Sequence, residues 1–167
     1  MITSPRGTVV WITGRPASGK STFAATLRAA VLARGLSCAV LDSDAVREAL
    51  GAHDYSESGR HDFYQSLGSL AALLARQDLI VLVPATAHRR AYREAARARA
   101  PRFLEVFVST PLEECARRDP KGLYARARSQ HLELPTADYE PPAQPDVVAT
   151  GGHDERAVAD VLVALAR

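Results

Sequence analysis

The eight residues Gly-Arg-Pro-Ala-Ser-Gly-Lys-Ser at positions 14–21 constrain this chain more than any other part of its sequence. They have the G-x-x-x-x-G-K-[ST] spacing, with an apolar β-branched run, Thr8–Ile12, before them and a helical stretch, Ser21–Arg34, after them. In this pattern the glycines let backbone N–H groups turn inward around an anion, and the following helix adds its positive end. A glycine turn that contains Lys-Ser by chance is the alternative, and the matching strand and helix argue against it. The sequence therefore predicts a loop that binds a nucleoside triphosphate.

The residues of this loop have different expected tasks. Lys20 can reach the β- and γ-phosphates, and the hydroxyl of Ser21 can coordinate Mg²⁺. ATP and Mg²⁺ are thus the expected cofactors. The predicted ATP-binding residues are Gly14, Arg15, Pro16, Ala17, Ser18, Gly19, Lys20, Ser21 and Thr22.

The composition limits what kind of protein this is. A chain of 167 residues, 47% of them hydrophobic, fits one domain over residues 1–167 with its own core. A formal net charge of +2 is too small a bias for a nucleic-acid-binding protein. No apolar run reaches the roughly 18 residues that cross a bilayer, and the N-terminus lacks the pattern of a secretory signal. Cys38 and Cys115 have no C-x-x-C spacing, which favours two buried thiols in a reducing compartment. We expect a cytoplasmic protein with a small-molecule acceptor, and neither nucleic acid nor membrane as a partner.

Strand and helix patterns alternate along the chain. Short runs rich in Val, Ile, Leu and Phe predict strands buried on both faces, at Thr8–Ile12, Ser37–Leu41, Leu79–Val83, Phe103–Val108 and near Pro145–Ala149. Helical stretches are predicted at Ser21–Arg34, Ser43–Leu50, Gly59–Arg76, His88–Arg99, Pro111–Arg117 and Asp154–Ala166. This alternation predicts an α/β fold with a parallel sheet and helices on both faces.

One segment, Arg117–Pro145, does not fit the alternation. Its first half is basic and its second half is rich in proline. Connections of this length in a compact domain are usually lids or disordered segments. We expect a lid over about residues 117–145, mobile without ligand and ordered when phosphates neutralise its charge.

Phosphoryl transfer also needs a carboxylate that organises magnesium near the phosphate loop. The run Leu79–Val83 is followed by no carboxylate, whereas Ser37–Leu41 leads into Asp42-Ser43-Asp44. If this second strand lies beside the first, both carboxylates face the γ-phosphate. One could orient Mg²⁺ through water and the other could accept the proton of the attacking hydroxyl. An Asp N-cap for the next helix is the alternative, but a cap needs only one carboxylate.

Two longer stretches resemble the adenylylsulfate kinase family, whose members phosphorylate the 3′-hydroxyl of adenosine 5′-phosphosulfate. Residues 103–115, Phe-Leu-Glu-Val-Phe-Val-Ser-Thr-Pro-Leu-Glu-Glu-Cys, are similar to that family's F-[IL]-E-V-[FY]-V-x-T-P-L-E-x-C. Residues 118–128 are similar to its lid motif R-D-P-K-G-L-Y-x-[KR]-A-R. The resemblance covers nearly the whole chain and implies a P-loop nucleotide-kinase fold, with a homodimer as a common assembly.

The resemblance also implies roles for individual residues. Asp42 and Asp44 match the two carboxylates of the family's D-G-D-N, so Lys20, Asp42 and Asp44 are the expected catalytic residues, with Ser21 and Asp42 at the metal. Arg118 is expected on ATP. The expected substrate-binding residues are Arg47, Arg60, Arg90 and Lys121, and the lid cations include Arg126 and Arg128.

The chain departs from the family's pattern on the acceptor side. Ala45 and Phe63 replace two Asn residues, Ala87 replaces a Ser, and Pro135 stands where a stacking Phe is usual. Two alternatives to adenylylsulfate phosphorylation therefore remain at this point. One is a kinase of the same fold that acts on another small anionic metabolite. The other is a nucleotide-binding regulator without turnover.

Overall fold

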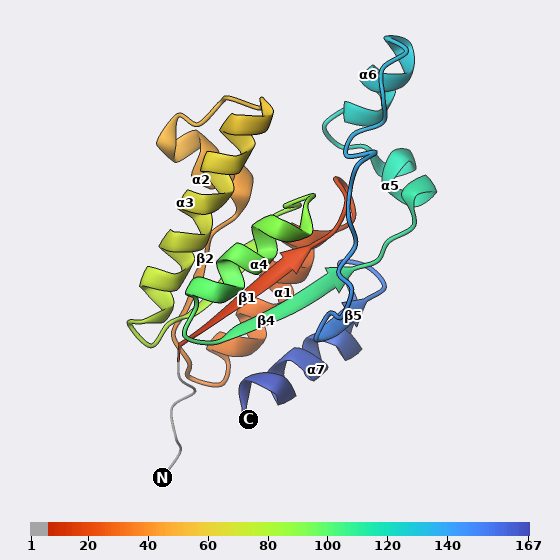
Figure 1. Cartoon of the computed structure of the whole chain (residues 1–167). Helices are drawn as coiled ribbons and strands as arrows, with labels where there is room; N and C mark the ends of the chain where they lie inside the picture. Colours follow the sequence, from red (N-terminus) through yellow and green to blue (C-terminus); the bar gives the residue numbers. More distant parts are fainter. Residues whose placement is uncertain (1–6) are drawn as a thin grey trace.

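Five parallel strands form one sheet in the computed structural model, which describes residues 7–167. Their bounds are β1 (Thr8–Thr13), β2 (Cys38–Val40), β3 (Ile80–Pro84), β4 (Phe103–Val108) and β5 (Val147–Ala149). The spatial order is β2-β3-β1-β4-β5, so β1 lies at the centre (Figure 1). All six residues of β1 are buried, as expected for an apolar run covered on both faces. The predicted α/β fold is confirmed.

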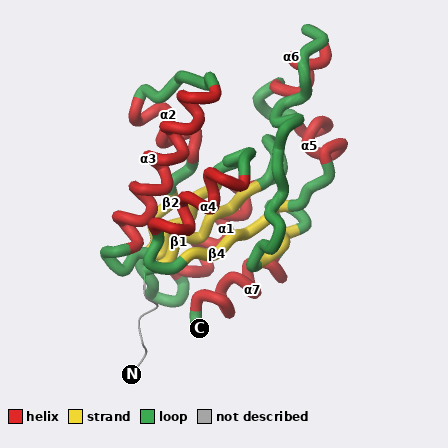
Figure 2. Tube along the Cα trace, viewed as in Figure 1, coloured by secondary structure: helices red, strands yellow, loops and turns green. Residues whose placement is uncertain are grey.

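Helices cover both faces of the sheet (Figure 2). Side chains of α1 and α7 pack with the sheet into one core, and side chains of α3 and α4 pack into the other. None of the helices in the described part of the chain is long and apolar enough to cross a membrane. The helices are α1 (Lys20–Leu32), α2 (Ser43–Leu50), α3 (Glu57–Ala75), α4 (Arg90–Arg99), α5 (Leu112–Arg118), α6 (Leu123–Ser129) and α7 (Glu155–Leu165).

The strand order corrects one expectation. The strand that leads into Asp42 does not lie beside β1, because β3 pairs with both β1 and β2 and separates them. Asp42 nevertheless lies next to the phosphate loop, because its carboxylate accepts a hydrogen bond from Ser21 at the start of α1. Parallel strands all end at the same edge of a sheet, and the chain after β2 returns toward α1 along that edge.

Element boundaries differ from the predicted ones in a few places. The helix expected from His88 begins at Arg90, because residues 85–89 form an irregular loop in which Ala87 has a positive φ of 39°. Residues 123–129 within the expected lid form a short helix, α6, that the sequence analysis did not predict. Cys115 is buried as expected, whereas Cys38 is only half-buried because β2 is an edge strand.

The packing of α3 against the sheet leads to a prediction about stability. Leu67 of α3 is fully buried, while Leu73 of the same helix is 54% exposed. We expect Leu67→Ala to lower the free energy of unfolding by about 2–5 kcal/mol, since it leaves a cavity in the core. Leu73→Ala, the matched control, is expected to change it by less than about 1 kcal/mol. Urea unfolding of both variants measures this, and equal losses would contradict the packing described here.

Candidate active site

The phosphate loop runs from β1 into α1 through backbone conformations that favour small residues. Ala17 and Gly19 both have positive φ angles, of 63° and 101°. A Cβ at Gly19 would lie 2.8 Å from the backbone N of Gly152, so the loop after β5 packs directly on the phosphate loop. On its other side, the hydroxyl of Thr110 donates to the carbonyl of Ser18 at 2.6 Å. The loop is therefore fixed from two directions before any ligand is present.

The ammonium of Lys20 folds back onto this loop. Its Nζ donates to the carbonyl oxygens of Gly14 and Arg15, at 3.0 and 2.8 Å. Burial lowers the pKa of Lys20 to about 8, and the carboxylate of Asp44 opposes that shift only in part. A phosphate group that binds here would stabilise this cation, because a charge-assisted hydrogen bond would replace part of the hydration that it has lost.

The two carboxylate oxygens of Asp42 make different contacts. Its Oδ1 accepts from the backbone N–H groups of Asp44 and Ala45, at 3.0 and 3.4 Å, and so caps the N-terminus of α2. Its Oδ2 accepts the hydroxyl proton of Ser21 at 2.7 Å. The cap therefore does not exclude a role for Asp42 at the phosphate loop, because the same carboxylate also contacts Ser21.

The second carboxylate, Asp44, has a different partner. It is exposed and forms an ion pair with Lys121 from the segment between α5 and α6. This contact brings the chain after α5 to the start of α2. Two of the predicted site residues, 77 positions apart in sequence, are therefore neighbours.

Most of the predicted donor-side residues line one cavity of about 390 Å³. Of the predicted site residues, Gly14, Arg15 and Ser18 shape the loop but do not line the cavity, and neither do Arg47, Arg60 and Arg90. Its lining comes from the phosphate loop and α1, from the start of α2, from the last residue of β3 and the loop after it, and from the end of α5 through the start of α6. These residues are Pro16, Ala17, Gly19, Lys20, Ser21, Thr22, Asp42, Ser43, Asp44, Pro84, Thr86, Arg118, Asp119, Pro120, Lys121, Leu123 and Tyr124.

Helices α5 and α6 stand off the edge of the sheet (Figure 1), and α6 lies in the first half of the expected lid. Tyr124 of α6 is fully buried, and its hydroxyl donates to the carbonyl of Pro16 at 2.9 Å. Burial raises the pKa of Tyr124 to about 12, so it remains a donor. Arg118 lines the cavity but pairs with Glu114, whose pKa is lowered to about 2 by Arg117 and Arg118. Arg126 and Arg128 are exposed on α6 and lie outside the cavity.

Two of the predicted acceptor-side arginines, Arg47 and Arg90, are held by the protein itself. Arg47 is 5% exposed, and its Nη1 donates to the carbonyl of Ala52 at 2.9 Å. Its guanidinium lies 3.8 Å from the ring centroid of Phe63 and 4.6 Å from that of Tyr55. Phe63, at a position where the family has Asn, is thus a core residue beneath Arg47.

Arg90 and Arg60 also lie apart from the cavity. Arg90 donates through Nε to the carbonyl of Pro141 at 2.7 Å, and its backbone N–H donates to Glu140. Arg60 is half-buried on α3. The structure therefore brings together the predicted donor site, and does not bring the three arginines into the same cavity.

Several residues around the site were missed by the sequence analysis. Thr110 and Tyr124 lie inside the two motifs that carry the family resemblance, so a role for them could have been suspected. Arg93 and Tyr139 are buried residues whose partners lie up to 126 positions away in the sequence, and no local sequence pattern predicts such contacts. In the described part of the chain, no three His, Cys, Asp or Glu side chains cluster as a metal site.

Comparison with known proteins agrees with this geometry. A relative from Synechococcus sp. (strain JA-2-3B'a(2-13)), an adenylyl-sulfate kinase, is 42% identical over 149 residues, covering 87% of this chain and 85% of its own. The APS kinase of Mycobacterium tuberculosis, solved in complex with AMPPNP and APS, superposes with a TM-score of 0.84 at 37% identity, over 96% of this chain and 98% of that one. The hexameric APS kinase from Thiobacillus denitrificans gives a TM-score of 0.70 at 25% identity, over 97% of this chain and 29% of that one. The profile of the family described as adenylylsulphate kinase matches residues 6–150, and the chain belongs to that family.

Proposed function

We propose that this protein transfers the γ-phosphoryl group of ATP to the 3′-hydroxyl of adenosine 5′-phosphosulfate. The observation that carries the proposal is that Lys20, Ser21, Asp42 and Asp44 line the same cavity in a chain of this family. A phosphoryl-transfer site needs cations on the phosphates, a metal position and a carboxylate near the acceptor hydroxyl. Lys20, the pair Ser21 and Asp42, and Asp44 would meet these three needs within this cavity.

The donor side of the reaction is assigned to the phosphate loop. Backbone N–H groups of the loop and of the first turn of α1 would cradle the phosphates, while the ammonium of Lys20 would leave Gly14 and Arg15 for the phosphate oxygens. The contact between Ser21 and Asp42 suits Mg²⁺, because one hydroxyl and one carboxylate leave room for phosphate oxygens and water. When bound there, Mg²⁺ would neutralise charge that develops on the transferred group.

The acceptor side is assigned to Asp44 and Lys121. In this arrangement Asp44 takes the proton of the acceptor hydroxyl as that oxygen attacks phosphorus. Before substrates arrive, this carboxylate is paired with Lys121. Lys121 and Arg118 would then turn toward the anionic groups of the two nucleotides, which is the movement expected of a lid.

A second candidate is a kinase of the same family that prefers another small anionic acceptor. It is favoured by Arg47, whose guanidinium is enclosed by Phe63 and Tyr55 and lies outside the cavity. An anion could still reach Arg47 if Tyr55, which is 57% exposed, turned away. Replacing Phe63 by Asn to restore the family pattern would put an amide into the core, so that change is expected to destabilise the protein.

The same family membership supports two wider proposals. We infer that the enzyme works in the cytoplasm, where both ATP and a reducing environment for Cys38 and Cys115 are found. We also infer that it assembles as an oligomer, with a homodimer as the expected form, since the related APS kinase from Thiobacillus denitrificans is hexameric.

The roles of the two carboxylates can be separated by substitution. We expect Asp44→Asn to lower kcat by about 100-fold, the range for losing a general base. Asp42→Asn is expected to raise the Mg²⁺ concentration needed for half-maximal rate while leaving stability nearly unchanged, because Asn caps a helix about as well as Asp. Glu48→Gln, at an exposed position on the same helix, is the control and should behave as wild type. Full kcat in Asp44→Asn would show that Asp44 is not the base.

The acceptor is tested by initial rates with ATP and Mg²⁺ over a panel of compounds. The panel contains adenosine 5′-phosphosulfate, other anionic nucleotides, sugar phosphates and neutral sugars, and Lys20→Ala provides the background without transfer. We expect adenosine 5′-phosphosulfate to give the highest kcat/KM. A sugar phosphate with a clear advantage would favour the second candidate, and a neutral sugar in first place would contradict both.

A further inference from the structure

The chain that returns from the lid to β5 is held firmly over the edge of the sheet. We call residues 136–142 the strap. The backbone N–H of Glu140 donates to the carbonyl of His88 at 2.8 Å, and the ring of Tyr139 is buried against Phe107 of β4. Only the part of the expected lid before the strap projects from the protein, as α6 (Figure 1). The strap therefore forms the root from which any lid movement would start.

A single buried arginine fixes the strap from below. Arg93 of α4 is 1% exposed and uses three of its N–H groups. Its Nη2 donates to the carbonyl of Glu140 at 2.6 Å, and its Nη1 donates to the carbonyl of Ala87 at 2.5 Å. The strap and the loop before α4 are thus held by the same guanidinium.

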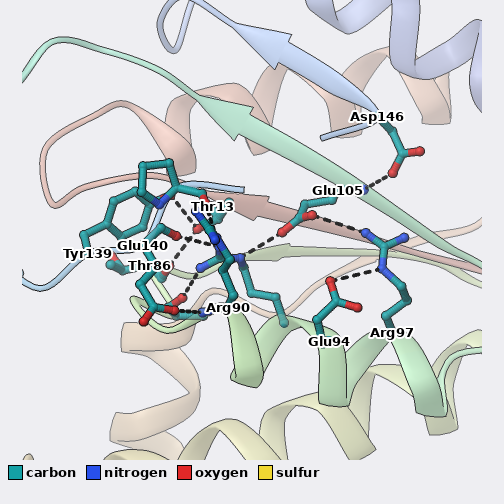
Figure 3. A network of polar contacts seen from close by, with 12 residues as sticks. Thr13, Thr86, Arg90, Glu94, Arg97, Glu105, Tyr139, Glu140 and Asp146 are labelled. Atoms are coloured by element: carbon teal, nitrogen blue, oxygen red, sulfur yellow. Dashed lines mark hydrogen bonds and ion pairs between the residues drawn. The ribbon is translucent and has the colours of Figure 1, made fainter. Parts of the chain in front are cut away.

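The third contact of Arg93 anchors it to the sheet. Its Nε donates to Oε1 of Glu105 at 2.8 Å, and Glu105 of β4 is itself 4% exposed. The other oxygen of Glu105 accepts from Arg97 at 3.2 Å, and the backbone N–H of Glu105 donates to Asp146 at 2.7 Å (Figure 3). Because a buried charge without its partner is costly, this ion pair restricts Arg93 to one orientation.

From the strap, Tyr139 reaches the residue immediately before the phosphate loop. The hydroxyl of Thr13, the last residue of β1, donates to the carbonyl of Thr86 at 2.7 Å. Its one proton is thereby used, so the Tyr139 hydroxyl, 3.0 Å away, must be the donor in the second bond (Figure 3). A continuous chain of hydrogen bonds links the strap, β1 and the loop after β3.

Two residues near these hydrogen bonds have a strained backbone. Ala87 and Thr136 have positive φ angles of 39° and 52°, although neither is a glycine. Their carbonyls accept from Arg93 and from Arg15 of the phosphate loop, respectively. Strained residues persist where their surroundings hold them, so arginine contacts maintain the shape on both sides of the loop.

We infer that Arg93 and Tyr139 are positioning residues for the nucleotide site: together they fix the root of the lid to the phosphate loop before ATP binds. Neither touches the donor cavity, so their effect on nucleotide is transmitted through Thr13, Ala87 and the strap. The inference rests on the proposed function only in taking MgATP as the ligand. It does not depend on which acceptor is phosphorylated.

The test measures the dissociation constant of MgATP without any acceptor, together with hydrogen exchange of the strap. Tyr139→Phe removes one hydroxyl and keeps the ring, and Arg93→Lys keeps the charge but cannot reach all three partners. We expect each to weaken MgATP binding by about three- to tenfold, the effect of losing one internal hydrogen bond. The amides of residues 139 and 140 should exchange faster in both variants. Combined, the two changes should weaken binding by less than the product of their single effects, since they act through one network.

Arg97→Ala is the matched control. It removes the other partner of Glu105 without touching the strap, so it is expected to lower the melting temperature while leaving MgATP affinity and strap exchange unchanged. The inference is overturned if Tyr139→Phe and Arg93→Lys bind MgATP as wild type does. It is equally overturned if Arg97→Ala weakens binding as much as they do, since loss of stability alone would then explain the effect. A failed acceptor assay leaves these binding measurements intact.

Discussion

The turn by which β1 becomes α1 is the constraint on which the rest of the site depends. Six residues separate the two elements, and the ammonium of Lys20 is folded back onto the carbonyls of Gly14 and Arg15 within that turn. Withdrawing a cation from water is unfavourable, and this burial lowers the pKa of Lys20 to about 8. The turn keeps this shape because its neighbours support it from several sides: Gly152 beneath Gly19, Thr110 on Ser18, and Tyr124 on Pro16.

The donor and acceptor sides of the site differ in how complete they are without ligand. On the donor side, Ser21 and Asp42 are already in contact at 2.7 Å. On the acceptor side, Asp44 is paired with Lys121 and Arg47 is enclosed by aromatic rings. If Asp44 and Arg47 bind the acceptor as proposed, they must exchange these internal partners for substrate. This division agrees with a chain that keeps the family's donor residues and departs from its pattern on the acceptor side.

Much of the fold could be predicted from the sequence because its signals are local. The buried run of β1, the glycines of the phosphate loop and the apolar runs of the other strands each depend on neighbouring residues. Strand order could not be predicted in this way, and Asp42 was expected near the phosphates through a pairing of β2 with β1 that the sheet does not contain. Its carboxylate reaches Ser21 because the loops of a parallel sheet converge at one edge. The contacts of Arg93 and Tyr139 join four separate segments, so residue types and spacing gave no indication of them.

Proton uptake on nucleotide binding tests most directly whether the buried ammonium of Lys20 is the receptor for phosphate. With a pKa of about 8, Lys20 is about half neutral at pH 8, and phosphate oxygens would raise that pKa and recharge it. Calorimetric titration of MgATP in buffers of different ionisation enthalpy should therefore show uptake of about half a proton at pH 8. At pH 6.5, where Lys20 is already charged, its contribution should disappear, and Lys20→Ala should lack it at both pH values. Tight binding at pH 8 with no proton uptake would contradict the central role given to Lys20.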